Sequence, residues 1–305
     1  MSMTVEPGLR QRTLAGSTVF AGIGVHSGQR VRVALRPAPV GHGVVFVRSD
    51  VTGCDNRIPA FAEYVASTQL NTEIRNAAGV SVSTIEHLMA ALAALGVDNA
   101  VVELDGAETP IMDGSAQPFL DILDRVGVRE QDAPRRSIEI VERVEIRSGD
   151  KWAALSPAAG FQVAFELQYA SKAIGTQRID LEVTEDSFRT ELAAARTFGF
   201  AHEVESLKAL GLAKGASLDN AVGLDGDLIL NPEGLRIERE FVRHKAMDAV
   251  GDLYTLGAPV IGRFESVKGG HALNNALCRA LLAQPSAWRW RPPTLAMVLS
   301  CTCVH

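Results

Sequence analysis

Residues 83–99, STIEHLMAALAALGVDN, and residues 241–259, FVRHKAMDAVGDLYTLGAP, decide the fold of this 305-residue chain. Each stretch predicts a long helix that carries a histidine near its start and ends in a turn containing a glycine. In each half an apolar strand follows the long helix, and a further helix follows that strand. The shared order indicates a distant duplication, in which the two long helices could bring His87 and His244 together.

The segments around these helices favour two domains, because 305 residues exceed the length of one typical domain. In the first half we expect strands at 16–21, 31–37, 43–48 and 99–104 and a helix at 115–126. In the second half we expect strands at 137–147, 152–156, 161–167 and 259–265 and helices at 184–195, 240–256 and 271–283. The polar stretch 127–136 contains Pro134, which is typical of a linker. We therefore expect an N-terminal α+β domain at 1–127, a linker at 128–136 and a C-terminal α+β domain at 137–305.

The composition excludes several classes of protein. A hydrophobic content of 47% with 22% charged residues is typical of a compact globular protein. The formal net charge of −6 argues against general nucleic-acid binding, which needs a basic face. No apolar run approaches the roughly 20 residues that span a bilayer. The first residues lack a secretion signal, so we expect a cytoplasmic protein. The four cysteines form no disulfide framework, and we expect reduced thiols.

Glu86 and His87 lie at the start of the first long helix and allow two interpretations. In the ordinary one, Ser83 and Glu86 form a capping box and His87 is a core histidine. In the functional one, both side chains serve a site, since an unpaired polar pair on so apolar a helix would be costly. The residues alone leave both interpretations open.

His244 and Asp248 are four residues apart on the second long helix, so they share one face, and Asp252 continues that stripe. The stripe could be an ordinary solvated face. Alternatively, its imidazole and carboxylate are two metal ligands one turn apart, and His87 supplies the third. Three protein ligands with one open position are typical of catalytic zinc, and Glu86 beside them would be a general base.

The other histidines give weaker signals. His202 begins His-Glu-Val-Glu-Ser, which lacks the second histidine of the His-Glu-x-x-His motif and so excludes a thermolysin-like peptidase. His271 follows Lys268-Gly269-Gly270 at the start of the last helix and, taken alone, is an ordinary histidine beside a turn. His26 lies in a Gly-rich turn and fits a hairpin residue better than a ligand.

Five segments carry distinctive sequences: 83–88 (STIEHL), 110–115 (PIMDGS), 195–200 (ARTFGF), 241–248 (FVRHKAMD) and 266–275 (SVKGGHALNN). Together they resemble the UDP-3-O-acyl-N-acetylglucosamine deacetylases, zinc enzymes of lipid A biosynthesis in Gram-negative bacteria. The resemblance runs in order from Gln11 to about Trp288. It implies two α+β domains of related topology, each a sheet packed against helices, with the active site at their interface.

The resemblance also implies the catalytic residues. One Zn²⁺ per chain, or Fe²⁺ in its place, would be held by His87, His244 and Asp248. Glu86 would be the general base and His271 the protonated partner of the reaction. Thr197 would donate a hydrogen bond to the developing oxyanion, and Asp252 would orient His271.

The implied substrate is UDP-3-O-(3-hydroxyacyl)-N-acetylglucosamine, whose 2-acetamido group is hydrolysed to acetate and a free amine. Lys245 and Phe198 would contact the sugar, Lys268 the diphosphate and Tyr169 the uracil. An insert near 200–223 would form an apolar passage for the acyl chain. The tail at 289–305, with Cys301, Cys303 and His305, departs from the family pattern. We expect a monomer without a nucleic-acid partner.

Two other functions compete with this one. An amidohydrolase that acts on another N-acyl substrate would need the same metal ligands, although the Lys268, Phe198 and insert matches weigh against it. A sugar-nucleotide or acyl-binding protein without turnover would not need a base beside an open metal site, so the presence of Glu86 argues against it.

Overall fold

The structure is a computed structural model of the chain and describes residues 10–293. The first half contains β1 (Arg10–Leu14), β2 (Thr18–Ile23), β3 (Arg30–Pro37), β4 (Val44–Arg48), β5 (Arg57–Pro59), η1 (Ala62–Tyr64), β6 (Val65–Ser67), β7 (Glu73–Arg75), β8 (Ser81–Val82), α1 (Glu86–Ala94), β9 (Ala100–Leu104) and α2 (Gln117–Val126). The next part contains β10 (Val128–Pro134), β11 (Ser137–Ile140), β12 (Val144–Ser148), β13 (Lys151–Ser156), β14 (Phe161–Gln168), β15 (Thr176–Glu182), α3 (Glu185–Ser187) and η2 (Phe188–Leu192). The last part contains β16 (Phe198–Phe200), α4 (Ala201–Ala209), β17 (Val222–Asp225), β18 (Leu228–Ile229), α5 (Glu240–Tyr254), β19 (Val260–Val267), α6 (His271–Leu282) and β20 (Trp288–Arg291).

The two halves repeat one arrangement of strands. In the first half β9 follows α1 and lies between β3, to which it is antiparallel, and β4, to which it is parallel. In the second half β19 follows α5 and lies between antiparallel β13 and parallel β14. A helix then follows each central strand, α2 after β9 and α6 after β19. The order that the sequence predicts for a duplication is therefore present in the sheets, and the fold is α+β with two related halves.

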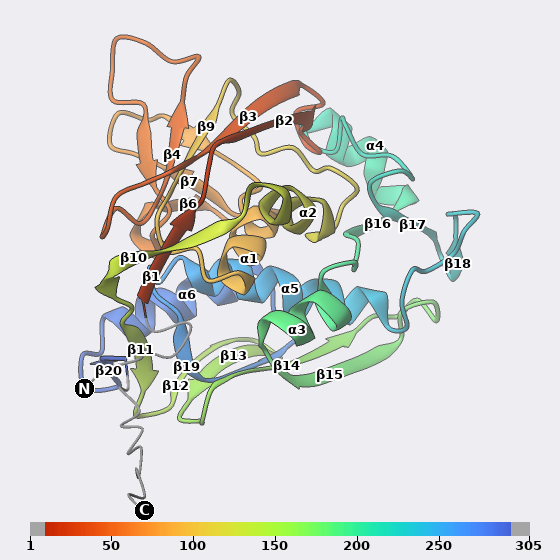
Figure 1. Ribbon diagram of the computed structural model, residues 1–305. Helices are drawn as coiled ribbons and strands as arrows, with labels where there is room; N and C mark the ends of the chain where they lie inside the picture. The colour runs from red at the N-terminus through yellow and green to blue at the C-terminus, as the bar shows by residue number, and fades with distance from the viewer. Residues whose placement is uncertain (1–9, 294–305) are drawn as a thin grey trace, which may run out of the picture.

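Each sheet has one face against the helices, as its residue pattern requires. Along β3, buried Val31 and Val33 alternate with exposed Arg30 and Arg32, and along β19 every second residue is buried. Such alternation is typical of a sheet that is solvated on its other face. Figure 1 shows α1 and α5 side by side in the middle of the molecule, between β2, β3, β4 and β9 on one side and β13, β14 and β15 on the other.

Gly251 allows α1 and α5 to touch along their backbones. A Cβ atom at this position would collide with the carbonyl oxygen of Glu86 and would lie 3.0 Å from the amide nitrogen of Ala90. The helix can tolerate this glycine because close packing against α1 compensates for its low helix propensity. The close approach places the first turn of α1 directly over the polar face of α5.

The segment 128–136, expected to be a linker, contains β10, which pairs antiparallel with β1. These two strands form a ribbon of their own, apart from the main sheets. Its polar residues give no sign of a strand because neither face of the ribbon is fully buried. That the domain boundary lies within 128–136 stays a proposal.

Several other elements differ from the expected ones. The strand expected at 137–147 is two strands, β11 and β12, which pair with different partners. The helix expected at 184–195 is one turn, α3, followed by the π-helical segment η2. The sequence did not predict the helix α4 inside the insert or the strands β1, β5–β8, β15–β18 and β20. Of the tail, Trp288–Arg291 form β20 beside β11, and Cys301, Cys303 and His305 lie outside the described residues.

Among residues 10–293, no helix is both long and apolar enough to cross a membrane.

Candidate metal centre and active site

His87, His244 and Asp248 form one buried cluster, here called the ligand cluster. One ligand atom from each lies within 4.8 Å of the others. The Nε2 atom of His87 lies 3.4 Å from Oδ1 of Asp248, and the Nε2 atom of His244 lies 3.4 Å from Oδ2. The first turn of α1 supplies His87, and two successive turns of α5 supply the other two. The three ligands predicted from the sequence are thus brought together from the two halves.

The chemistry of the ligand cluster fits a divalent cation. The Oδ1 atom of Asp248 is buried and has no hydrogen-bond partner among the described residues, which is costly unless a cation completes it. Burial, only partly opposed by Asp248, lowers the pKa of His244 to about 3, so its imidazole is neutral. The Nδ1 atom of His244 lies 3.1 Å from the carbonyl oxygen of Ala195, which leaves the Nε2 lone pair for a metal. Two imidazole nitrogens and a carboxylate oxygen form a possible metal site.

Lys245 adds a positive charge next to the ligand cluster. Its Nζ atom donates to Oδ2 of Asp248 over 2.8 Å and lies 5.8 Å from the centre of the Phe198 ring. Burial raises the pKa of Asp248, but the nearby His244 and Lys245 outweigh it and hold the pKa well below its ordinary value. Asp248 is therefore a carboxylate, the form that a metal ligand requires.

Glu86 lies beside the ligand cluster without being part of it. The capping-box interpretation of Glu86 is wrong, since α1 has Ile85 at its N-cap position and no side chain caps it. Instead, the Oε2 atom of Glu86 accepts a hydrogen bond of 3.0 Å from the backbone N–H of Thr72. Burial raises the pKa of Glu86, and the nearby His271 and His87 oppose the rise. A raised pKa suits a carboxylate that takes and returns protons near neutral pH.

Asp252 is the centre of a second buried cluster, here called the Asp252 cluster, made of Asp252, His271, Asn274 and Thr72. Its Oδ2 atom lies 2.8 Å from Nδ1 of His271 and accepts a hydrogen bond of 2.8 Å from Nδ2 of Asn274. Its Oδ1 atom accepts a hydrogen bond of 2.6 Å from the hydroxyl of Thr72. Burial lowers the pKa of His271, but Asp252 outweighs it and the pKa is raised to about 9. His271 is therefore a cation at neutral pH.

A cavity of about 450 Å³ opens beside these groups and takes its lining from both halves. Glu86, His87 and His271 lie on its wall. The predicted catalytic residue Thr197 and the predicted substrate-binding residues Tyr169, Phe198 and Lys245 also line it. Apolar residues of the insert form part of that wall: Phe200, Val204, Leu207, Ala213 and Ala216. The insert reaches the first half through backbone hydrogen bonds from Lys214 and Gly215 to His26 and Val25. A possible metal site beside a partly apolar cavity is typical of a metal-dependent enzyme.

Comparison with known proteins assigns this arrangement to a family. The family model described as "LpxC: UDP-3-O-acyl N-acetylglycosamine deacetylase" matches residues 11–283. The chain belongs to this family. A protein of Phenylobacterium zucineum (strain HLK1) named "UDP-3-O-acyl-N-acetylglucosamine deacetylase" is 65% identical over 281 residues, which cover 92% of this chain and 96% of that protein.

Proteins of the same name from two other organisms are more distant. The protein of Acidithiobacillus ferrooxidans (strain ATCC 53993 / BNL-5-31) is 48% identical over 284 residues, covering 92% of this chain and 93% of that protein. The protein of Myxococcus xanthus (strain DK1622) is 49% identical over 282 residues, covering 92% and 89%. The similarity to LpxC proteins thus includes both halves and the insert within the second half.

Of the four residues predicted to bind the substrate, Tyr169, Phe198 and Lys245 line the cavity and Lys268 does not. Its Nζ atom donates to Asp150 over 2.6 Å instead. Tyr169 does line the cavity, where its ring centre lies 5.9 Å from those of Phe198 and Phe200. The residues predicted to contact the sugar and the uracil therefore share one wall, and the residue predicted to contact the diphosphate lies outside it.

Three residues of the site were not predicted to have a role. Thr72 lies in a loop without any periodic pattern, so the sequence offers no signal for it. Asn274 lies within the segment SVKGGHALNN, where its place one turn after His271 is the signal that was available. His26 does lie in a turn, as expected, but its side chain also lines the cavity, and burial lowers its pKa.

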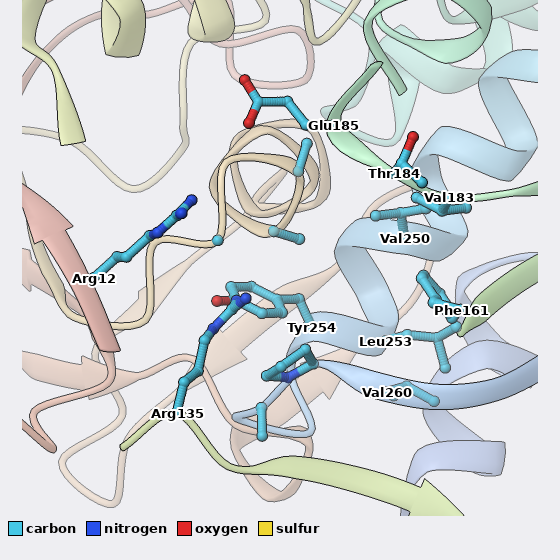
Figure 2. A pocket seen from close by; sticks show the side chains of 15 residues that line it. Arg12, Arg135, Phe161, Val183, Thr184, Glu185, Val250, Leu253, Tyr254 and Val260 are labelled. Atoms are coloured by element: carbon cyan, nitrogen blue, oxygen red, sulfur yellow. The ribbon is translucent and has the colours of Figure 1, made fainter. Parts of the chain in front are cut away.

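A second cavity, of about 250 Å³, lies toward the C-terminal end of α5 (Figure 2). Arg12 and Arg135 approach it from one side, and Val250, Leu253 and Val260 form part of its apolar wall. The Nε atom of Arg135 donates to Asp98 over 2.8 Å, so this guanidinium already has a carboxylate partner. The cavity contains none of the predicted ligands or catalytic residues, and we assign the chemistry to the first cavity.

Proposed function

We propose that this chain is a zinc-dependent amidohydrolase that removes the acetyl group from UDP-3-O-(3-hydroxyacyl)-N-acetylglucosamine, the committed step of lipid A biosynthesis. Curated relatives that cover almost the whole chain carry the name UDP-3-O-acyl-N-acetylglucosamine deacetylase. The observation that carries the proposal is the ligand cluster, of which His87 lines a cavity together with Glu86. A cytoplasmic location and a monomeric state stay predictions from the sequence.

The donor set favours zinc over the hard cations that prefer oxygen ligands. Two imidazole nitrogens and one carboxylate oxygen are typical ligands of catalytic zinc, and Fe²⁺ is the alternative that the same donors allow. When bound, Zn²⁺ polarises a carbonyl group and lowers the pKa of water. Asp248, which carries the only negative charge among the three donors, would supply the charge that attracts the cation.

Glu86 and His271 would divide the proton transfers of the reaction. Glu86 takes a proton from the water that attacks the acetamide carbon, because its carboxylate lies at the cavity wall and its raised pKa makes it a stronger base than an ordinary glutamate. His271, held as a cation by Asp252, stabilises the oxyanion together with the hydroxyl of Thr197. The departing nitrogen needs a proton, and both Glu86 and His271 line the cavity as donors.

The remaining cavity wall would bind the substrate. The cation Lys245 and the ring of Phe198 form one polar and aromatic face for the sugar, and Tyr169 extends this face toward a planar uracil. The apolar side chains of the insert, among them Val204 and Leu207, suit an acyl chain. Lys268 would have to leave Asp150 to reach the diphosphate.

Acetate release from the acylated substrate, measured with metal-replete and with chelated protein, tests the proposal. We expect turnover that chelation abolishes and added Zn²⁺ restores. We also expect a much lower kcat/KM for UDP-N-acetylglucosamine without the 3-O-acyl group, because binding energy from the acyl chain is lost. Equal turnover of both substrates would favour an amidohydrolase of other specificity, and binding without acetate release would favour a binding protein.

A further inference from the structure

Thr72 joins the catalytic groups of the two halves. It lies directly before β7 in the first half and is 2% exposed. Its backbone N–H donates to Glu86 over 3.0 Å, and its hydroxyl donates to Oδ1 of Asp252 over 2.6 Å. The same hydroxyl oxygen lies 3.3 Å from Nδ1 of His271. One small residue therefore contacts the base Glu86 and both members of the Asp252–His271 pair.

The hydroxyl group of Thr72 fills a defined place in the Asp252 cluster. Oδ2 of Asp252 contacts His271 and Asn274, whereas Oδ1 accepts its hydrogen bond from the hydroxyl of Thr72. A hydroxyl can donate one hydrogen bond and accept others at once. Thr72 can thus donate to Asp252 while its oxygen accepts a share of the Nδ1–H of His271. These contacts fix both the rotation of the carboxylate and the orientation of the imidazole.

We propose that Thr72 is a positioning residue of this active site, whose hydroxyl aligns Asp252 and, through it, His271. The inference rests on the proposed deacetylase function and adds a residue to its machinery. Thr72 does not line the cavity, and its amide and hydroxyl groups contact Glu86, Asp252 and His271. Its effect on the reaction must therefore pass through Glu86, Asp252 and His271. Supporting hydrogen bonds of this kind are typically worth about 10- to 100-fold in activity.

The substitutions Thr72→Val and Thr72→Ser separate the hydroxyl from the rest of the residue. Valine keeps the size and the backbone N–H to Glu86 but removes the hydroxyl, whereas serine keeps the hydroxyl. We expect Thr72→Val to lower kcat about 10- to 100-fold, with KM and zinc content unchanged. We expect Thr72→Ser to recover most of kcat.

Thr13→Val is the matched control for a loss of stability. Thr13 is also fully buried, and its hydroxyl donates to the carbonyl oxygen of Asn99 over 2.6 Å and accepts from the N–H of Ala38 over 2.9 Å. Neither partner lines the cavity. We expect Thr13→Val to lower the Tm at least as much as Thr72→Val while keeping kcat. Equal kcat losses in the two valine variants, or a normal kcat in Thr72→Val, would overturn the proposal.

A readout without substrate keeps this inference apart from the proposed function. In histidine-labelled full-length protein, the Nδ1–H of His271 should exchange slowly with water in the wild type and in Thr72→Ser, and faster in Thr72→Val. If the wild type releases no acetate, the proposed function fails and this exchange measurement alone decides the role of Thr72. Equal exchange in all three proteins would overturn that role whatever the activity.

Discussion

The ligand cluster and the Asp252 cluster lie one turn apart on α5 and are both almost fully buried, yet their hydrogen bonding differs. In the ligand cluster, Oδ1 of Asp248 and Nδ1 of His87 have no hydrogen-bond partner among the described residues. In the Asp252 cluster, both carboxylate oxygens accept hydrogen bonds, and the orphan atom is the amide oxygen of Asn274. Buried polar atoms are normally hydrogen-bonded, so the free Oδ1 atom of Asp248 suits a metal ligand, whereas the fully hydrogen-bonded carboxylate of Asp252 suits a residue that orients its neighbours.

The largest effects should come from substitutions that distinguish the role of the ligand cluster from the role of Glu86. We expect His244→Ala to lose both bound metal and activity, since one of three ligands is gone. We expect Glu86→Gln to keep its metal but to lose about 10²- to 10⁴-fold in kcat, the usual contribution of a general base. Metal content by elemental analysis and kcat by acetate release, measured on the same samples, check both statements.

Thr13→Val is a suitable control here as well, because it changes a buried polar residue outside the site. Equal metal loss in His244→Ala and Glu86→Gln would mean that Glu86 is itself a ligand. The roles assigned to the two clusters would then need to be redrawn.

The pH dependence of activity should show the influence of Asp252 on His271. The pKa of His271 is raised to about 9, so its cation is present below that pH and is lost as the pH rises through it. The pKa of Glu86 is raised above 4.5, so its carboxylate is lost as the pH falls through that raised value. A plot of kcat/KM against pH should therefore be a bell with a basic limb near pH 9.

Asp252→Asn should move the basic limb toward the ordinary histidine value of 6.5 and lower the maximum about 10- to 100-fold. The acidic limb should move little, because Asp252 is the smallest of the causes acting on Glu86. A basic limb that stays in place in Asp252→Asn would assign it to a group other than His271.

The proximity of His244 and Asp248 could be predicted from the sequence because it depends on one helix alone. His244 and Asp248 are one helical turn apart, so any helix at this place puts them on one face. Helical periodicity likewise predicted α1, α2, α5 and α6 with ends correct to within about two residues. His87 was harder, since its meeting with His244 depends on the packing of two helices and was supported by the duplicated order and by the family resemblance.

The Asp252 cluster was predicted only in part because its contacts are distant in sequence. Thr72 and Asp252 are 180 residues apart, and no pattern around Thr72 marks it. The strands β10 and β20 could not be predicted for a related reason. β10 has no fully buried face, and β20 lies at the edge of its sheet, where its exposed residues hide the alternation of buried and exposed positions. Contacts between residues of one helix can therefore be predicted from the sequence better than contacts between a loop of one half and a helix of the other.

The smallest effect expected is on the stability of the metal-free protein, and it compares the two aspartates directly. Asp252→Asn should lower the free energy of unfolding by about 1–3 kcal/mol, because an amide replaces a carboxylate that accepts three hydrogen bonds in the interior. Asp248→Asn should cost less, because Asp248 accepts one hydrogen bond, from Lys245, and its Oδ1 atom has no hydrogen-bond partner among the described residues. Saturating Zn²⁺ should then raise the Tm of the wild type and of Asp252→Asn but not of Asp248→Asn. Similar losses for both variants without metal, measured by chemical denaturation, would show that the ligand cluster is a structural ion network.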